Sequence, residues 1–344
     1  MNSVVRFVAV ALGLLLTLCL TLVIFGLPLG PSLSRIATGA FGSEAGIARS
    51  LVRMTPLLLA GLGMVLAWRA GMYNIGGEGQ FIVGGLTGAT LYKLAPGLPP
   101  ALLGISILVV SAVGGALYAA LAGWLQISRG VQVVISTILL NFIALHLLDY
   151  CVNGPLREQA GQNPLTDRLP DLAMLAKFSV RTDLHAGIFL AIITALLVFG
   201  FLFFTSPGFK IRLVGENQRA ARANGISPER VQILAMALSG ALCGLAGGVE
   251  YTALAGQLGR SFSENWGFLA IPVALLGGLH PLGLIPSSLY FGALLAGTDY
   301  LSRFSVGGKS IIYLIQGAAV LVFMGLQRWF DQKQPVVLDE EART

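Results

Sequence analysis

Three polar side chains interrupt a long apolar stretch near the start of the chain. Asn74, Glu78 and Gln80 lie in the run RAGMYNIGGEGQFIVGG (69–85), whose glycines weaken a helix at that point. Irregular backbone at membrane depth is tolerated only when it is buried in protein or lines a cavity, and a carboxylate there is commonly functional. The run therefore predicts part of a pathway for a polar solute. An alternative stays open, in which Glu78 caps the helix that follows the break, and both interpretations can hold.

Two further polar residues lie inside apolar segments. Asn141, in STILLNFIAL, could hydrogen-bond a neutral polar solute or join two helices, and the second role is favoured. Glu250, in GLAGGVEY, is a candidate for the same pathway or for a structural hydrogen-bond network. The predicted pathway residues are Asn74, Glu78, Gln80, Asn141 and Glu250.

Motifs for catalysis and for metal binding fail on inspection. The run Gly308-Lys309-Ser310 resembles the end of a phosphate-binding loop, but Arg303 stands where the first glycine of such a loop belongs. Cys19, Cys151 and Cys243 share no metal or redox spacing. We therefore expect no catalytic residue, no metal ligand and no cofactor in this chain, which excludes an enzyme.

The composition points to a membrane protein. The 344 residues are 55% hydrophobic and only 11% charged, whereas a soluble domain carries roughly 25% charged residues. The apolar runs do not alternate with polar residues as barrel strands do, so the predicted class is an all-α polytopic membrane protein. The net charge of +6 fits basic residues at helix ends beside anionic lipid better than it fits nucleic acid.

Hydropathy divides the chain into about ten transmembrane helices, since each span needs ~20 apolar residues. Single spans are predicted at 5–27, 101–127, 131–150, 184–205, 232–255 and 310–327, and two spans each in 51–95 and 266–300. The paired regions are broken at NIGGEGQ and GGLHPLG, in matching positions of the two halves, as in inverted-repeat transporters.

We expect a single transmembrane domain over 1–344. Its parts are a first half (about 1–183), a polar segment (about 206–231), a second half (about 232–330) and a tail (331–344). The connection from 153 to 183 is predicted to be an irregular external loop with at most a short helix, because it contains three prolines. The glycines at 240, 244, 247 and 248 predict close helix packing.

The polar segment is the densest charged stretch of the chain. Asn217 can cap a short helix, Gly225 can end it in a left-handed conformation, and Pro228 prevents its simple continuation. Arg219 and Arg222 would then remain free for acidic partners. We interpret the segment as a docking surface for a soluble motor; an ordinary solvated loop is the alternative.

Charge also predicts orientation. The positive-inside rule weights short loops, so five basic residues in this one segment favour its cytoplasmic placement, with both termini inside: Lys210, Arg212, Arg219, Arg222 and Arg230. Arg35, Arg49 and Arg53 favour the opposite orientation.

Several runs, taken together, resemble a known family. They are NIGGEGQ (74–80), VQVVISTILLNFIAL (131–145), VGENQRAARANGI (214–226), ALSGALCGLAGG (237–248) and VALLGGLHPLG (273–283). In order and spacing, from about 50 to 327, they resemble the permease subunit of bacterial ABC importers, within the nucleoside and simple-sugar group related to ribose and branched-chain amino acid permeases.

The resemblance implies partners and a mechanism. Such permeases pair as dimers, with a second and commonly different permease in nucleoside systems. They bind ABC ATPase subunits, which carry ATP and Mg, and receive the solute from an extracytoplasmic binding protein at the bacterial inner membrane. Import of a simple sugar such as ribose is an alternative substrate. A stand-alone ion-coupled carrier using Glu78 and Glu250 is an alternative class, and a membrane scaffold a third.

The resemblance also assigns the contact with the ATPase. The matching residues of the coupling loop are Gly215, Glu216, Asn217, Arg219, Ala220, Ala221, Arg222 and Gly225. Many importers have a glutamate before the two alanines, where this chain has Arg219. That departure puts the usual acidic contact in doubt.

Overall fold

The computed structural model describes residues 3–159, 163–179, 182–304, 314 and 317–318. Most of the predicted span 310–327, the 308–310 run and the tail 331–344 lie outside the described residues. The chain divides into two compact units, which are considered separately: Met1–Gly39 with Gly297–Thr344, and Ala40–Ala296.

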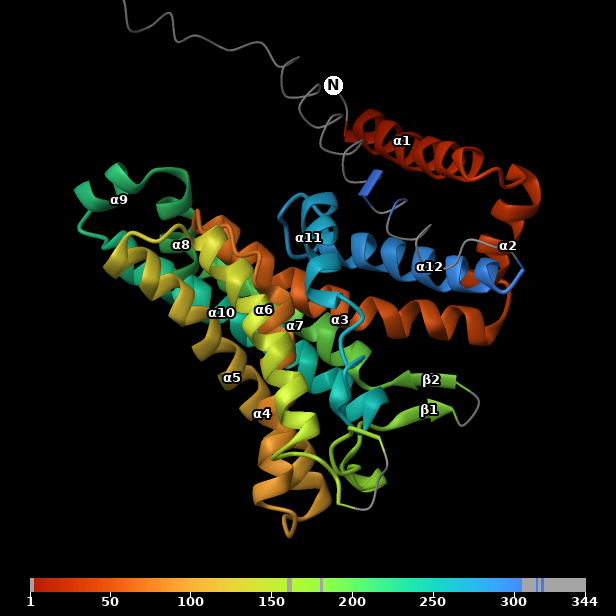
Figure 1. The fold of residues 1–344 in the computed structure, drawn as a ribbon. Coiled ribbons are helices and arrows are strands. Elements are labelled where there is room, and N and C mark those ends of the chain that lie inside the picture. The colour runs from red at the N-terminus through yellow and green to blue at the C-terminus, as the bar shows by residue number, and fades with distance from the viewer. Residues whose placement is uncertain (1–2, 160–162, 180–181, 305–313, 315–316, 319–344) are drawn as a thin grey trace, which may run out of the picture. The chain divides into compact units, whose positions relative to one another are not determined.

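The described chain is almost entirely helical (Figure 1). Its α-helices are α1 (Ser3–Ile24), α2 (Leu29–Phe41), α3 (Glu44–Arg69), α4 (Gly77–Leu94), α5 (Pro100–Arg129), α6 (Val133–Asn153), α7 (Gly187–Phe204), α8 (Ser206–Glu216), α9 (Gln218–Ala223), α10 (Pro228–Glu250), α11 (Trp266–Leu276) and α12 (Leu284–Ser302). A 3₁₀ turn, η1 (Asp171–Ala173), two strands, β1 (Lys177–Ser179) and β2 (Thr182–His185), and a π-helical turn, η2 (Tyr251–Ala255), complete the elements.

Five described helices are long and apolar enough to cross a membrane: α3, α5, α6, α7 and α10 continued through η2. They correspond to the predicted spans 101–127, 131–150, 184–205 and 232–255 and to the first half of 51–95. The predicted all-α polytopic class is confirmed. Most backbone N–H and C=O groups of the described chain are therefore hydrogen-bonded within helices, which a lipid environment requires.

The two predicted breaks are also confirmed. α3 ends at Arg69 before α4 begins at Gly77, and α11 ends at Leu276 before α12 begins at Leu284. α3, however, begins at Glu44, seven residues before the predicted start of the region. Ser43 caps it, because its hydroxyl oxygen accepts a hydrogen bond from the amide of Gly46 at 3.1 Å. The arginines at 49 and 53 lower the hydropathy of these first turns. Hydropathy alone therefore placed the start of the region too late.

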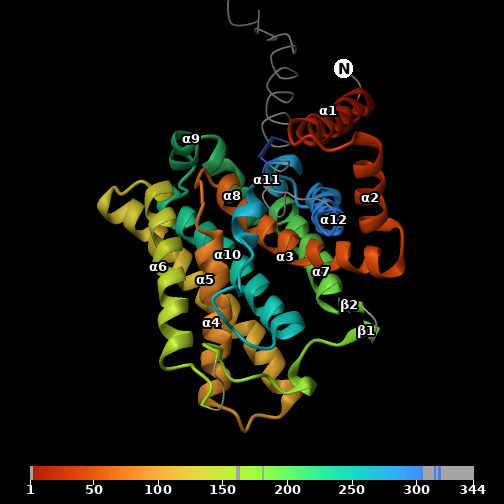
Figure 2. The same ribbon diagram turned by 45° about the vertical axis from the view of Figure 1, so that its right-hand side comes forward.

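In the unit Ala40–Ala296, α10 packs against α3, α4 and α5 (Figures 1 and 2). α5 and α10 cross at glycines: a Cβ on Gly244 would lie 2.2 Å from the carbonyl oxygen of Ser111, and one on Gly240 would lie 2.2 Å from that of Gly115. Gly247 makes an equally close approach to the backbone of α4 at Phe81. The predicted close packing of the α10 glycines is confirmed.

A glycine also allows close helix contact in the unit Met1–Gly39 with Gly297–Thr344. The α12 residue Gly297 lies against the backbone of Ile36 in α2, where a Cβ would meet the carbonyl oxygen at 2.4 Å. The guanidinium of Arg35 stands 5.0 Å from the centre of the Phe304 ring, a cation–π distance. A glycine in α12 and an arginine–aromatic contact just after its end thus hold α2 against this part of the chain.

The connection 153–183 differs from the prediction, because it contains part of a two-stranded antiparallel sheet. β1 pairs with β2 in the register Lys177 to His185, and Lys177 forms an ion pair with Asp183 at 2.7 Å. The ring of Phe178 packs edge-on against Phe189 of α7, with centroids 5.6 Å apart. The strands are too short for an alternating pattern to show, and the contact with α7 that supports them is tertiary.

The α5–α10 crossing yields a stability prediction. Gly244→Ala should lower the free energy of unfolding by about 1–3 kcal/mol, because the added methyl overlaps backbone that cannot move aside. Gly200→Ala in α7 is the matched control, since nothing lies within 4 Å of a Cβ there. Thermal unfolding in detergent would measure both. Equal stability of the two variants would contradict the crossing.

His185 yields a pH prediction. Burial, aided by Lys177 and opposed by Asp183, lowers the pKa of His185 to about 4, and its Nδ1 accepts a hydrogen bond from the amide of Gly187 at 3.1 Å. Because the neutral form is favoured in the fold, its stabilisation is complete above the unfolded pKa of about 6.5. It should be lost as the pH falls toward 4. The protection factors of the β2 amides, which are corrected for the intrinsic exchange rate, should therefore fall as the pH is lowered from 6.5 to 4, and less so in His185→Asn.

Candidate functional site

The break between α3 and α4 is held by a buried amide pair. Asn74 and Gln80 exchange two hydrogen bonds of 3.0 Å each between their side-chain amides. Asn74 also accepts from the amide of Gly76 at 2.8 Å and donates to the hydroxyl of Ser239 in α10 at 2.9 Å. Both side chains are almost completely buried. Asn74 therefore fixes the irregular backbone at the break and ties it to α10.

A second amide supports the same break from α6. Asn141 donates to the carbonyl of Ile75 at 2.9 Å and accepts from the amide of Gly79 at 2.8 Å. The hydroxyl of Thr137, one turn earlier, accepts from the amide of Ile75 at 3.3 Å. These bonds satisfy backbone groups that the break removes from the helix, as burial requires. In this structure Asn141 joins helices, the role favoured from sequence.

Glu78 lies where two helices begin. A Cβ on Gly267 would meet the amide nitrogen of Glu78 at 2.1 Å, so the N-termini of α4 and α11 are in backbone contact. The Glu78 carboxylate accepts from the amide of Gly267 at 2.9 Å and from the hydroxyl of Ser263. It therefore caps α11, the neighbouring helix, and a negative charge stabilises the positive dipole end that it meets. Sequence suggested a cap of α4 itself and could not show that the partner lies 189 positions away.

The two breaks are connected through Arg69. Its Nε donates to the carbonyl of Leu279, in the second break, at 2.9 Å. A Cβ on Gly215, in α8, would lie 2.0 Å from the carbonyl oxygen of Arg69. Gln232 of α10 approaches the next carbonyl, that of Ala70, at 3.4 Å. The end of α8 thus rests directly on the backbone that leads into the first break.

The predicted coupling residues form a compact corner at the end of the unit opposite β1 and β2 (Figure 1). Asn217 caps α9, since its side-chain oxygen accepts from the amides of Arg219 and Ala220 at 2.9 and 3.0 Å. Gly225 follows α9 with a left-handed φ of 72°. The predicted short helix and both of its ends are confirmed.

The α9 helix presents one side to its own protein and the other outward. Ala221 is completely buried, whereas Glu216, Arg219 and Arg222 are exposed. Arg222 differs from expectation, because it forms an ion pair with Glu229 at 2.5 Å, across the turn to α10. Arg219 has no ion pair with any residue that the structure describes. Of the two arginines, Arg219 is therefore the one that α9 leaves open to a partner.

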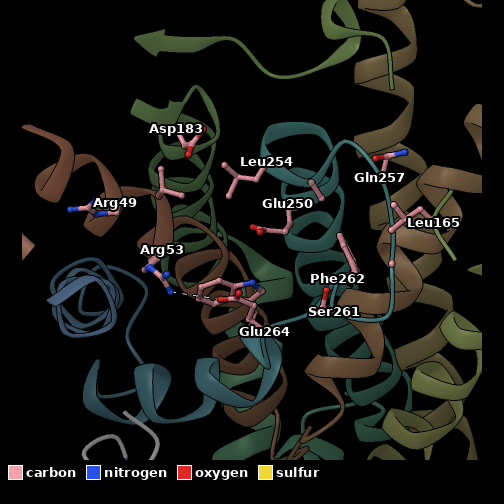
Figure 3. Close-up of a pocket in the computed structure, with 14 residues that line it drawn as sticks. Arg49, Arg53, Leu165, Asp183, Glu250, Leu254, Gln257, Ser261, Phe262 and Glu264 are labelled. Atoms are coloured by element: carbon pink, nitrogen blue, oxygen red, sulfur yellow. Dashed lines mark ion pairs between the residues drawn. The ribbon is translucent and has the colours of Figure 1, made fainter. Parts of the chain in front are cut away.

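Glu250 lies apart from the breaks, in a cavity of about 480 Å³. The cavity is bounded by α3, η2 and the loop from 256 to 265, with contributions from Leu165 and Asp183. Figure 3 shows Glu250 extending toward Arg53, which in turn is joined to Glu264. The distance between the two charged groups of that pair is 3.8 Å.

The structure thus separates the five predicted pathway residues into two places. Asn74, Glu78, Gln80 and Asn141 form hydrogen bonds within the protein at the breaks. Glu250 lines the cavity of about 480 Å³ instead. Sequence reasoning missed four residues that complete these places: Ser239 and Ser263 at the breaks, and Arg53 and Trp266 at the cavity. Nothing local marks the serines, and Arg53, at the start of the predicted region 51–95, was considered only for orientation.

Comparison with known proteins agrees with this architecture. Residues 46–324 match the family described as branched-chain amino acid transport system / permease component. The chain belongs to this permease family. It is therefore a transport subunit and a multi-pass membrane protein.

Three relatives illustrate the range of the family. The permease is 31% identical to the glucose ABC transporter permease protein TsgB13 of Haloferax volcanii, over 84% of this chain and 78% of the relative. It is 30% identical to the guanosine ABC transporter permease protein NupP of Bacillus subtilis, over 86% and 85%. It is 31% identical to the nucleoside ABC transporter permease protein NupB of Lactococcus lactis subsp. cremoris, over 84% and 81%. A second permease of each of the latter two bacteria, NupQ and NupC, also matches, at 31% and 29% identity.

The position of Glu78 yields a test of the contact between α4 and α11. Glu78→Ala should lower the free energy of unfolding by about 1.5–3 kcal/mol, because it removes the charged acceptor of the Gly267 amide and leaves that amide buried. Hydrogen exchange at the start of α11 should rise with it. Glu78→Gln should lose less, since its amide oxygen can still accept one bond. Glu216→Ala, at an exposed position, is the control, and an effect as large there would argue against the cap.

Proposed function

We propose that this permease is the transmembrane subunit of an ATP-driven ABC importer that moves nucleosides into the cytoplasm. Family membership supports the transport role, and relatives described as guanosine and nucleoside permeases support the solute. A simple sugar is the second candidate, because a glucose permease protein matches at similar identity.

One observation carries the proposal: the exposed helix α9 is joined through α8 to the backbone between α3 and α4. Gly215 permits this contact, since any side chain would collide with Arg69. Force applied to α9 by an ATPase would therefore reach both breaks, the first through Arg69 and the second through the bond from Arg69 to Leu279. A loop that was merely solvated would need neither the buried Ala221 nor the contact at Gly215.

The proposal specifies partners and orientation. ABC ATPase subunits bind α9 on the cytoplasmic side of the bacterial inner membrane and carry the ATP and Mg; both termini of the permease are on that side. A second permease completes the dimer, and the presence of two matching permeases in each of two bacteria supports a different chain. An extracytoplasmic solute-binding protein delivers the solute to the end that carries β1 and β2.

We further propose different roles for the pathway residues. Asn74, Glu78, Gln80 and Asn141 keep the broken helices in register, because their polar groups are engaged within the protein. Their role is therefore structural, and they do not contact the solute. Glu250, which faces a cavity, contacts the solute.

The coupling role is tested by reversing charge on α9. Arg219→Glu should reduce ATP-driven uptake roughly tenfold or more, because like charges facing an interface cost several kcal/mol and 1.4 kcal/mol corresponds to about tenfold. Membrane expression should be unchanged, since Arg219 is exposed and has no ion pair within the described chain. Uptake of labelled adenosine by cells that express the complete transporter is the measurement.

The control for this experiment keeps the charge at the same position. Arg219→Lys retains a positive group on the exposed side of α9. It should leave uptake almost unchanged. Normal uptake by Arg219→Glu would remove the coupling assignment. Uptake driven by protons or sodium without any ATPase would favour a secondary carrier instead.

A further inference from the structure

The cavity at Glu250 contains a carboxylate that no described part of the protein satisfies. Glu250 lines the cavity, and its carboxylate makes no hydrogen bond with any described residue. Buried polar groups without a partner are rare in proteins and call for an explanation. Trp266, which is only 4% exposed, lines the same cavity with its ring.

The charged groups of the lining are acidic in excess. Two are basic, Arg49 and Arg53, and three are acidic, Asp183, Glu250 and Glu264. Asp183 is paired with Lys177 at 2.7 Å, and Arg53 lies 3.8 Å from Glu264. An anionic ligand would add like charge to a partly desolvated site, which is costly. The lining therefore disfavours an anion and favours an uncharged solute that donates hydrogen bonds.

The rest of the lining is apolar and aromatic. Val52, Leu165, Leu254 and Phe262 contribute to it beside the polar groups. The volume of about 480 Å³ falls within the range of about 300–1,000 Å³ that is usual for small-molecule sites. A ligand with one apolar face and a few hydroxyl groups would fit both parts of the lining.

The backbone around Glu250 is also unusual. α10 ends there in the π-helical turn η2, in which the amide of Gly256 donates to the carbonyl of Tyr251 at 2.9 Å, five residues back. Such turns are rare and frequently occur at functional sites. Here the turn brings Leu254 and Ala255, along with Glu250, to the cavity.

We infer that this cavity is a solute-binding site of the single permease chain, and that its ligand is an uncharged solute with neighbouring hydroxyl groups, such as the ribose of a nucleoside. The inference rests on the proposed import function and locates the solute within it. The carboxylate of Glu250 accepts hydrogen bonds from two neighbouring hydroxyls, as acidic residues do with ribose in other proteins. The apolar wall, together with the ring of Trp266, covers its less polar face.

The site is connected to the break by a short segment. Phe262, Glu264 and Trp266 line the cavity, while Ser263 and Gly267, between and beside them, bind Glu78. A solute that moves this segment therefore acts on the residues that cap α11. The cavity is thus connected to the start of α11 through Gly267. Arg69 binds the carbonyl of Leu279, which follows the other end of α11.

Binding to the full-length permease, purified with its partner subunits into lipid nanodiscs without the binding protein, tests the inference. Adenosine, ribose, adenine and AMP are the probes, and equilibrium binding of the labelled compounds is the readout. We expect adenosine to bind, adenine and AMP to bind at least about tenfold more weakly, and Glu250→Gln to weaken adenosine about 10- to 100-fold, the usual worth of hydrogen bonds to a charged group. Trp266→Phe should weaken it less.

Two further variants keep the test decisive. Ser261→Trp fills the cavity from an exposed loop position, so it should abolish binding even if Glu250→Gln alters the fold. Asp171→Asn and Trp124→Phe, both exposed and outside the cavity, are the matched controls and should bind as the parent does.

The outcomes separate this inference from the import function. ATP-driven uptake of adenosine with unchanged binding in Glu250→Gln and Ser261→Trp would overturn the cavity and leave the import function standing. Binding of adenine or AMP as tight as that of adenosine would overturn the ligand class. Absence of uptake and of ATPase association in the unmodified transporter would overturn the import function itself.

Discussion

The structure depends on one buried carboxylate at the meeting point of two helix N-termini. α4 and α11 begin in backbone contact, and each presents unsatisfied amides and a positive dipole end to the other. Without a negative charge the two ends would repel and leave buried donors unpaired. Glu78 lies one residue inside α4 and reaches the first amides of α11, so one side chain stabilises the start of the neighbouring helix and fixes its position.

Close backbone contacts carry this arrangement through the rest of the unit. α10 approaches α5 at Gly240 and Gly244 and α4 at Gly247, and α8 meets the end of α3 at Gly215. In lipid, where apolar side chains gain little by association, such contacts supply much of the packing energy. They also make the unit stiff, because backbone cannot yield as a side chain does. A displacement of α8 is therefore passed to the breaks and is not absorbed at the contact.

The polar residues of the membrane region divide by whether the protein satisfies them. Those at the breaks bind one another and the broken backbone, which leaves little capacity for a solute. The carboxylate at the cavity, that of Glu250, has no hydrogen bond to any described residue. This difference is the basis for the two proposed roles, a structural one for the residues at the breaks and a solute-binding one for Glu250. One change of conformation could affect both places, since the segment from Phe262 to Gly267 serves the two.

The sequence by itself determined the all-α membrane class, the two breaks, the α9 helix with its cap at Asn217 and its end at Gly225, and the small-residue face of α10. Each depends on local composition or on bonds between near neighbours. Only the tertiary structure decided that Glu78 caps α11, that Arg222 is paired with Glu229, that 177–185 includes two paired strands, and that Glu250 faces a cavity with Trp266. Most of these contacts join residues that are distant in the chain, and even the nearer pairs depend on how the chain turns and packs between them. No pattern in a single sequence records which distant group completes a buried hydrogen bond.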